Sequence, residues 1–370
     1  MANIFDYLDW RGDIPFSVDP FCAVDALILS ELSYTKFENI PDDSSQISII
    51  DAEKEFFKVH TIEEILASTS LTARAPLLMK KMNAGARFKN TKICNYVNEI
   101  DYSNDSQFSA STFILDDDTA FISFRGTDGT VVGWKEDFNL SYLDETAGQR
   151  SAVEYLNKIG RDFCLKIRVG GHSKGGNFAV YAASFCNPDI QNELINVFSF
   201  DAPGFKSKVI VSDGYKNILP KIQRIVPDTS IIGTLLSHDS EKMVVKSTAS
   251  GLLQHDGFSW EVLGNSFVNA EISDISIFIE KTLSNWLENT TDDERKLITD
   301  TVFGLFESTG NDTFHKMSEQ KWRTTESIFE SIKTIPKEQR QEVSHMVLSL
   351  LQTGGKVATE NIPKKTISKK

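Results

Sequence analysis

Residues 167–186 read IRVGGHSKGGNFAVYAASFC, and this stretch decides the fold. Gly171-His172-Ser173-Lys174-Gly175 matches the pattern G-x-S-x-G, in which glycines leave room for a serine on a strained turn between a strand and a helix. The apolar residues before Gly170 form the expected strand. The small residues that follow the serine let a helix lie close to the neighbouring strands. The stretch therefore predicts a nucleophile elbow with Ser173 at its tip.

Strands and helices alternate around this elbow. KICNYVNEID, STFIL and TAFISFRGT, between Lys92 and Thr127, have the composition of successive strands. Beyond them we expect a helix at 147–163 and strands at 194–200, 222–226 and 243–247. Such alternation is typical of an α/β domain with a mostly parallel central sheet flanked by helices. Residues 1 to about 90 show only short helical patterns and are expected to be a lead-in.

The strand pattern stops near residue 268, and amphipathic helices begin. Ile275, Ile279, Leu283 and Trp286 fall on one helical face. Thr291-Asp-Asp-Glu294 predicts a capping box for the next helix.

Two further helices are expected after these, at 322–335 and from Pro336 to a stop at Gly354-Gly355. We therefore expect three parts, namely a hydrolase-type domain at 1–268, an all-helical appendage at 269–355 and a frayed tail at 356–370.

Length and charge limit the classes of function. With 370 residues the chain is long enough for one large α/β domain and an extra module. Its 39 Lys and Arg against 52 Asp and Glu give a formal net charge of -13, which repels nucleic acid and anionic bilayers. The first residues lack a signal-peptide pattern, and charges interrupt every apolar run before the roughly 18 residues that span a membrane. We expect a cytoplasmic protein with no nucleic-acid partner and no stable membrane insertion.

Four motifs together resemble a known family. GHSKGGNFAVYAA at 171–183 occurs with YLDWRGD at 7–13, ISFRGTDGTVVGWKEDFN at 122–139 and QHDGFSW at 254–260. In this order they resemble the Mbeg1-like family, a domain of unknown function in the α/β-hydrolase superfamily that is similar to class 3 lipases. The resemblance extends to about residue 265. It implies an α/β-hydrolase fold and leaves the substrate open.

The expected general base is His255. A serine nucleophile needs a base, and in α/β-hydrolases the acid and then the histidine follow the serine in the chain. His255 comes after the last expected strand, in the loop where this fold places its base. His238 precedes that strand, whereas His315 and His345 lie in the appendage, where we expect solvated side chains. Class 3 lipases carry their histidine in a similar late loop before an aromatic residue, so the resemblance agrees.

Three aspartates could orient this histidine. Asp228 ends the second strand after the elbow, which is the commoner position for the acid, and it is our choice. Asp201 ends the first strand and is the alternative, because an aspartate there can also cap the following helix. Asp256 would have to fold back on its neighbour His255.

Two backbone N–H groups are candidates for an oxyanion hole. The Lys174 N–H lies at the N-terminus of the helix after the elbow. Arg125-Gly126-Thr127 ends a strand, where these hydrolases supply the second donor, and Thr127 is the candidate. The triplet is similar to the RGT or RGS of class 3 lipases, whose next segment forms a mobile lid that carries a tryptophan.

The corresponding segment here is 128–139, with Gly129 and Gly133 as candidate hinges and Trp134 as an apolar plug. Its three acidic residues, Asp128, Glu136 and Asp137, are not typical of a lid that binds a lipid surface. A soluble ester or thioester is therefore as credible a substrate as a lipid, and an ordinary charged surface loop is the alternative to a lid.

We arrive at two hypotheses of different classes. The first is a serine hydrolase that cleaves a carboxylic ester, in a lipase-like or esterase-like way or on a thioester, through a Ser-His-Asp triad and an acyl-enzyme. The second is a non-catalytic binding or regulatory protein whose appendage recruits a partner. No cofactor or metal is expected, because HExxH, P-loop and G-x-G-x-x-G patterns are absent and the four cysteines form no CxxC pair.

Overall fold

The computed structural model describes residues 1–308 apart from 38–39, 42, 44, 69 and 164, and beyond them residues 313, 332–333 and 335–360. His315 and residues 361–370 lie outside the described residues. The helix expected at 322–335 also lies outside them, except at its last few positions.

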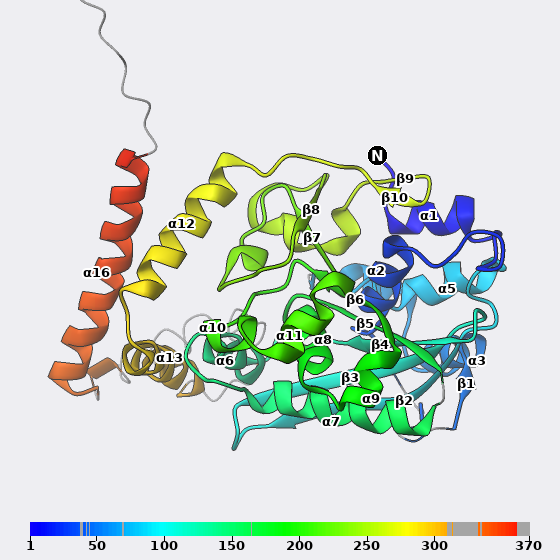
Figure 1. Cartoon of the computed structure of the whole chain (residues 1–370), viewed down its shortest axis with the longest axis horizontal. Coiled ribbons are helices and arrows are strands. Elements are labelled where there is room, and N and C mark those ends of the chain that lie inside the picture. Colours follow the sequence, from blue (N-terminus) through cyan, green and yellow to red (C-terminus); the bar gives the residue numbers. More distant parts are fainter. Residues whose placement is uncertain are drawn as a thin grey trace, which may run out of the picture.

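An eight-stranded sheet organises the molecule, and its spatial order follows the chain from β1 to β8 (Figure 1). β1 to β4 pair antiparallel, and β4 to β8 pair parallel. The strands are β1 Ile47–Ser48, β2 Lys92–Asp101, β3 Ser106–Ile114, β4 Thr119–Phe124, β5 Lys166–His172, β6 Leu194–Phe200, β7 Ile222–Pro227 and β8 Lys242–Val245. The predicted α/β class with a mostly parallel sheet is confirmed.

Two layers of helices cover the two faces of the sheet. Successive side chains of a strand point to opposite faces, and in β4 Phe121 joins one apolar core while Ile122 joins the other. The layer on the Ile122 face contains α7 Ala147–Asp162, α8 Lys174–Phe185, α9 Pro188–Glu193 and α11 Asp213–Ile218. The layer on the Phe121 face contains α1 Ile4–Arg11, α2 Ala23–Leu32, α3 Ile49–Phe56 and α5 Leu77–Ala84.

The N-terminal helices are part of the domain core, and the expectation of a lead-in was wrong. α2 is buried along almost its whole length and packs on β4, β5 and β6. Asp25 of α2 forms a buried salt bridge with Arg87, with 2.5 Å between Oδ2 and Nη2. Tyr7 donates a hydrogen bond to the same carboxylate. α2 also contains Asp25, Ser30 and Glu31, which are buried as well, so it has no polar face that would mark which side packs on the core.

Shorter elements lie in the loops around the sheet. They are α4 Ile62–Ala67, α6 Val131–Asn139, α10 Ser207–Ile210, the 3-10 turns η1 Leu219–Lys221, η2 Ile232–Thr234, η3 Gly251–His255 and η4 Gly257–Ser259, and the hairpin of β9 Val262–Leu263 with β10 Ser266–Phe267. The loops at the carboxyl ends of β4 to β8 lie along one edge of the sheet, which is where α/β folds place their sites.

Three described helices follow the hairpin: α12 Asp274–Glu288, α13 Asp292–Glu307 and α16 Lys337–Glu360. The predicted capping box of α13 is present, because Thr291 and Glu294 exchange hydrogen bonds between side chain and backbone. α16 packs along α12, and α13 packs against α6 (Figure 1). No helix of the described residues is both long and apolar enough to span a bilayer.

The expected helix stop at Gly354-Gly355 was wrong, because α16 continues through both glycines to Glu360. A Cβ atom added to Gly354 would lie 3.5 Å from Thr282 and 3.9 Å from Phe278, both on α12. Gly354 thus faces α12 at ordinary van der Waals distance, and α16 packs on α12 along this face. Packing of this kind offsets the roughly 1 kcal/mol that a glycine costs inside a helix.

Candidate active site

Ser173 occupies the turn between β5 and α8, with φ 57° and ψ -134°. A non-glycine residue at such a φ is strained. The glycines on either side are required by close contacts: a Cβ on Gly171 would lie 2.3 Å from the Gly175 carbonyl carbon, and one on Gly175 would lie 2.0 Å from the Phe124 carbonyl oxygen. The motif therefore forms the strained strand-to-helix turn that its spacing predicts.

Asp201 and His255 form a close pair beside this turn. The His255 Nδ1 lies 2.6 Å from the Asp201 Oδ2. The other carboxylate oxygen of Asp201 accepts hydrogen bonds from the Ser230 hydroxyl and, at 3.1 Å, from the Gly233 N–H. Burial raises the pKa of Asp201, but the hydrogen bond and charge of His255, with Ser230, outweigh it and hold this pKa below its usual value. The carboxylate is thus ionised, and it accepts a hydrogen bond from the Nδ1–H of His255, which fixes the orientation of the imidazole ring.

The choice of Asp228 as the orienting acid is corrected by this geometry. The Asp228 side chain accepts a hydrogen bond from Thr229, and its backbone pairs with Val245 and Ser273. Its strand, β7, is separated from the elbow strand β5 by β6. Asp201 ends β6, the direct neighbour of β5, which is why its carboxylate reaches the histidine.

The third candidate acid, Asp256, has a different role. Its carboxylate pairs with Arg74, with 2.9 Å between Oδ2 and Nη2, and it caps η4 through the Phe258 N–H. Of the other described histidines, His345 is exposed on α16. His238 does not line the cavity that contains Ser173.

His172, the residue before the nucleophile candidate, supports the His255 loop. Its Nε2 lies 2.7 Å from the His255 carbonyl oxygen, and its Nδ1 lies 3.1 Å from the Tyr34 hydroxyl. Burial, followed by the charge of His255, lowers the pKa of His172 to about 3. A neutral ring with a proton on Nε2 therefore donates to the backbone of the base loop. Only one feature of the sequence pointed to this role: His172 directly precedes Ser173 within the G-x-S-x-G motif.

Thr127 lies beside the elbow, where the second oxyanion donor was expected. A Cβ on Gly126 would lie 2.6 Å from the His172 carbonyl oxygen and 3.1 Å from the Ser173 Cβ, so the two backbones are in contact. The Thr127 hydroxyl donates to the Asp137 carboxylate. Burial raises the pKa of Asp137 to about 6, although the Lys174 charge and the Thr127 hydrogen bond act in the opposite direction.

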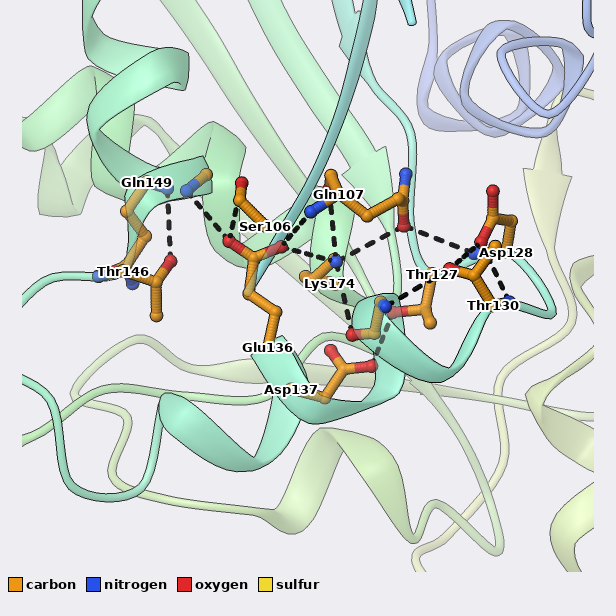
Figure 2. A network of polar contacts seen from close by, with 12 residues as sticks. Ser106, Gln107, Thr127, Asp128, Thr130, Glu136, Asp137, Thr146, Gln149 and Lys174 are labelled. Carbon is orange, nitrogen blue, oxygen red and sulfur yellow. Dashed lines mark hydrogen bonds and ion pairs between the residues drawn. The ribbon is translucent and has the colours of Figure 1, made fainter. Parts of the chain in front are cut away.

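The Lys174 side chain is fully buried and forms an ion pair that the sequence did not reveal (Figure 2). Its Nζ lies 2.8 Å from the Glu136 Oε2 and donates to the Gln107 side chain and to the carbonyls of Gln107 and Gly133. Glu136, also fully buried, accepts hydrogen bonds from the Gln107 and Gly148 N–H groups at 3.0 and 2.8 Å. The elbow helix α8, strand β3 and helix α6 are thereby joined through one pair of charges.

The Lys174–Glu136 network restricts the movement of residues 128–139, the segment that was expected to form a lid. α6 covers most of the 128–139 segment, and its Trp134 lines the cavity, as expected for the plug, with 41% of its surface exposed. However, Glu136 and the Gly133 carbonyl tie α6 to Lys174. Opening the whole segment would take Glu136 away from Lys174, and a buried charge without its partner costs about 3–5 kcal/mol. In this arrangement α6 is a wall of the site.

A cavity of about 680 Å³ connects these parts. Ser173, His255, Thr127 and Trp134 all line it. Its size falls within the range of small-molecule sites. Among the described residues, no group of three His, Cys, Asp or Glu side chains is arranged to bind a metal ion.

The order of the sheet and the strand-to-helix elbow at Ser173 together define an α/β-hydrolase fold. The chain belongs to the Mbeg1-like family, whose model matches residues 82–304.

The similar solved structures include lipases. The M37 lipase has 16% identity and a TM-score of 0.36, and the match covers 57% of this chain and 69% of that one. The Rhizomucor miehei lipase–propeptide complex has 18% identity and a TM-score of 0.32, covering 42% and 57%. The Lip2 lipase of Yarrowia lipolytica has 14% identity and a TM-score of 0.33, covering 50% and 73%. No curated protein matches the chain.

Proposed function

We propose that this protein is a serine hydrolase that cleaves carboxylic esters through an acyl-enzyme. The observation that carries the proposal is the Asp201–His255 pair at 2.6 Å, whose carboxylate is buried and whose histidine lines the same cavity as the strained Ser173 turn. A carboxylate, an imidazole and a serine in this chain order have the roles of acid, base and nucleophile in α/β-hydrolases.

Each residue has a defined part in the reaction. Asp201 holds the Nδ1–H of His255, which leaves Nε2 free to take the proton from the Ser173 hydroxyl as its oxygen attacks the ester carbonyl. The Lys174 and Thr127 N–H groups stabilise the resulting oxyanion. His255 then gives its proton to the leaving alcohol, or to the thiol of a thioester. A water molecule, activated by the same imidazole, hydrolyses the acyl-enzyme.

Labelling with a fluorophosphonate tests the proposal, since this probe reacts with an activated serine. Wild-type protein should label, and Ser173→Ala should not. Ser141→Ala is the matched control: Ser141 also lines the cavity, but its hydroxyl donates to the Phe138 carbonyl and it lies on no strained turn. Ser141→Ala should label as well as wild type. Absence of labelling in all three proteins would favour the non-catalytic binding or regulatory function.

A further inference from the structure

The cavity is lined on one side by the C-terminal helices. α12 contributes Leu283, Trp286 and Leu287, α13 contributes Ile298, and α16 contributes Met346 and Leu350. Figure 1 shows α12 and α16 on the opposite side of the molecule from α2, whose Glu31 lines the same cavity. The appendage therefore completes the chamber that contains Ser173.

Two of the contacts between the appendage and the rest of the molecule lie at opposite ends of the site. Phe303 of α13 packs edge-on against Phe138 of α6, with ring centroids 5.3 Å apart. Ser276 of α12 donates a 2.6 Å hydrogen bond to the carbonyl of Ser230, whose own hydroxyl holds Asp201. One end of the appendage thus packs on the α6 wall, and the other contacts the loop that fixes the acid. This double attachment holds the apolar side chains at a set distance from the nucleophile.

The cavity has an apolar side, on the appendage, and a polar side that includes the Glu31 and Asp137 carboxyl groups. On the appendage side, Arg295 donates to the Leu287 and Thr290 carbonyls and pairs with Asp292. On the α2 side, burial and then the charge of Asp256 raise the pKa of Glu31 well above its usual value, which favours its neutral form. The chemistry of the appendage side thus fits an uncharged hydrocarbon part of a ligand.

Building on the proposed function, we infer that α12, α13 and α16 form the hydrocarbon-binding wall of the active site and select esters by chain length. The hydrocarbon chain of the ester, whether on its acyl or its alcohol side, lies against Leu283, Trp286, Met346 and Leu350 while the carbonyl lies at Ser173. Each methylene buried there raises kcat/KM by about fourfold until the wall is covered, as expected from the transfer of a methylene out of water.

The experiment compares two tryptophan substitutions on the same helix. Leu350→Trp fills the cavity, whereas Leu348→Trp places the same side chain at a position that is 55% exposed and does not line it. kcat/KM is measured for p-nitrophenyl esters from acetyl to hexadecanoyl and for a series of alkyl acetates. The first series varies the acyl chain and the second varies the alcohol chain. Circular dichroism and thermal melts check that both variants fold.

Leu350→Trp should lower the ratio of kcat/KM for the dodecanoyl ester to that for the acetyl ester, or the matching ratio in the alkyl series, by tenfold or more, on the order of the loss of two or three buried methylenes. Leu348→Trp should leave both ratios within twofold of wild type. The series that responds shows which side of the ester carries the chain. Unchanged ratios in both series, in a folded and active Leu350→Trp protein, would overturn the inference.

A binding measurement separates this inference from the proposed function. Ser173→Ala protein is titrated with 1-octanol, a neutral alkyl chain, and tryptophan emission is recorded with Trp286→Phe in the same background as the reference. If 1-octanol binds saturably and Leu350→Trp weakens this binding tenfold, the result would support the hydrocarbon-binding wall, even if the protein hydrolyses no ester. Ester hydrolysis without such binding would support the enzyme and argue against the wall.

Discussion

The two sides of the cavity are held by opposite kinds of interaction. On the elbow side, Lys174 and Glu136 are fully buried charges, each satisfied by neighbours at specific distances. On the appendage side, the lining is made of side chains such as Leu283 and Leu350, whose contacts have no preferred direction. Charged networks impose one geometry and fail when one member is lost, whereas apolar walls tolerate volume-conserving changes.

This difference suits the chemistry that we propose for each side. A nucleophile and its oxyanion donors must be placed to within a fraction of an ångström. A hydrocarbon chain needs only a dry surface of sufficient length. Substitutions on the elbow side should therefore act on turnover and stability, and substitutions on the appendage side should act on chain-length preference.

The largest effect is expected at the acid. Asp201→Asn removes the charge that orients and stabilises the His255 imidazole, and it should lower kcat by about 10⁴-fold while the fold is retained. Asp228→Asn should change kcat by less than about threefold, since its side chain contacts Thr229 rather than the imidazole. Steady-state kinetics on a p-nitrophenyl ester measures both. The reverse order of the two losses would restore our original assignment of Asp228.

The next effect concerns the buried ion pair. Lys174→Met leaves the Glu136 carboxylate buried without its cation and should lower the free energy of unfolding by about 3–5 kcal/mol. The double variant Lys174→Met/Glu136→Leu removes both charges and should recover part of this loss, which urea unfolding can measure as a double-mutant cycle.

Lys206→Met is the control for this cycle. Lys206 pairs with Asp144 and Asp292, whose side chains are both more than half exposed, and its loss should cost less than about 1 kcal/mol. If Lys174→Met and Lys206→Met lowered the free energy of unfolding equally, the buried ion pair on the elbow side would contribute no more to stability than an exposed one.

A smaller loss is expected at the contact between the two sides. Phe303→Ala removes the ring that packs on Phe138 and Phe306, and it should cost about 3 kcal/mol, near the low end for a buried phenylalanine. It should also weaken the preference for long-chain esters. Leu351→Ala, at a position that is 67% exposed, should stay within about 0.5 kcal/mol of wild type. An unchanged chain-length profile in Phe303→Ala would show that α13 does not position the wall.

The smallest effect is a pH dependence from Asp137. Because the pKa of this carboxyl is raised to about 6, the folded protein keeps its proton at a pH where the unfolded chain has lost it. Its contribution to stability is complete below about pH 4 and is lost as the pH rises to 6, with a slope of at most about 1.4 kcal/mol per pH unit. Asp137→Asn should remove this slope. Urea unfolding of both proteins at several pH values between 3.5 and 7 tests this, and parallel curves would contradict it.

Sequence patterns were sufficient for the elements that short stretches encode. The strands at 194–200 and 222–226, the capping box at Thr291 and the elbow at Ser173 all follow from local periodicity, capping chemistry and glycine spacing. These features depend on residues within a few positions of one another, so the local amino-acid sequence is enough to predict them.

Contacts between distant segments needed the tertiary structure. Asp201 and Asp228 both end parallel strands, and only the position of β6 next to β5 brings Asp201 to the histidine. Nothing near Lys174 in the chain reveals that Glu136, 38 residues away, neutralises it. The packing of α16 on α12, which accompanies the continuation of α16 through Gly354, is equally non-local. In each case the outcome depends on which buried surfaces meet, because an unpaired charge or an uncovered apolar face costs more than any local preference provides.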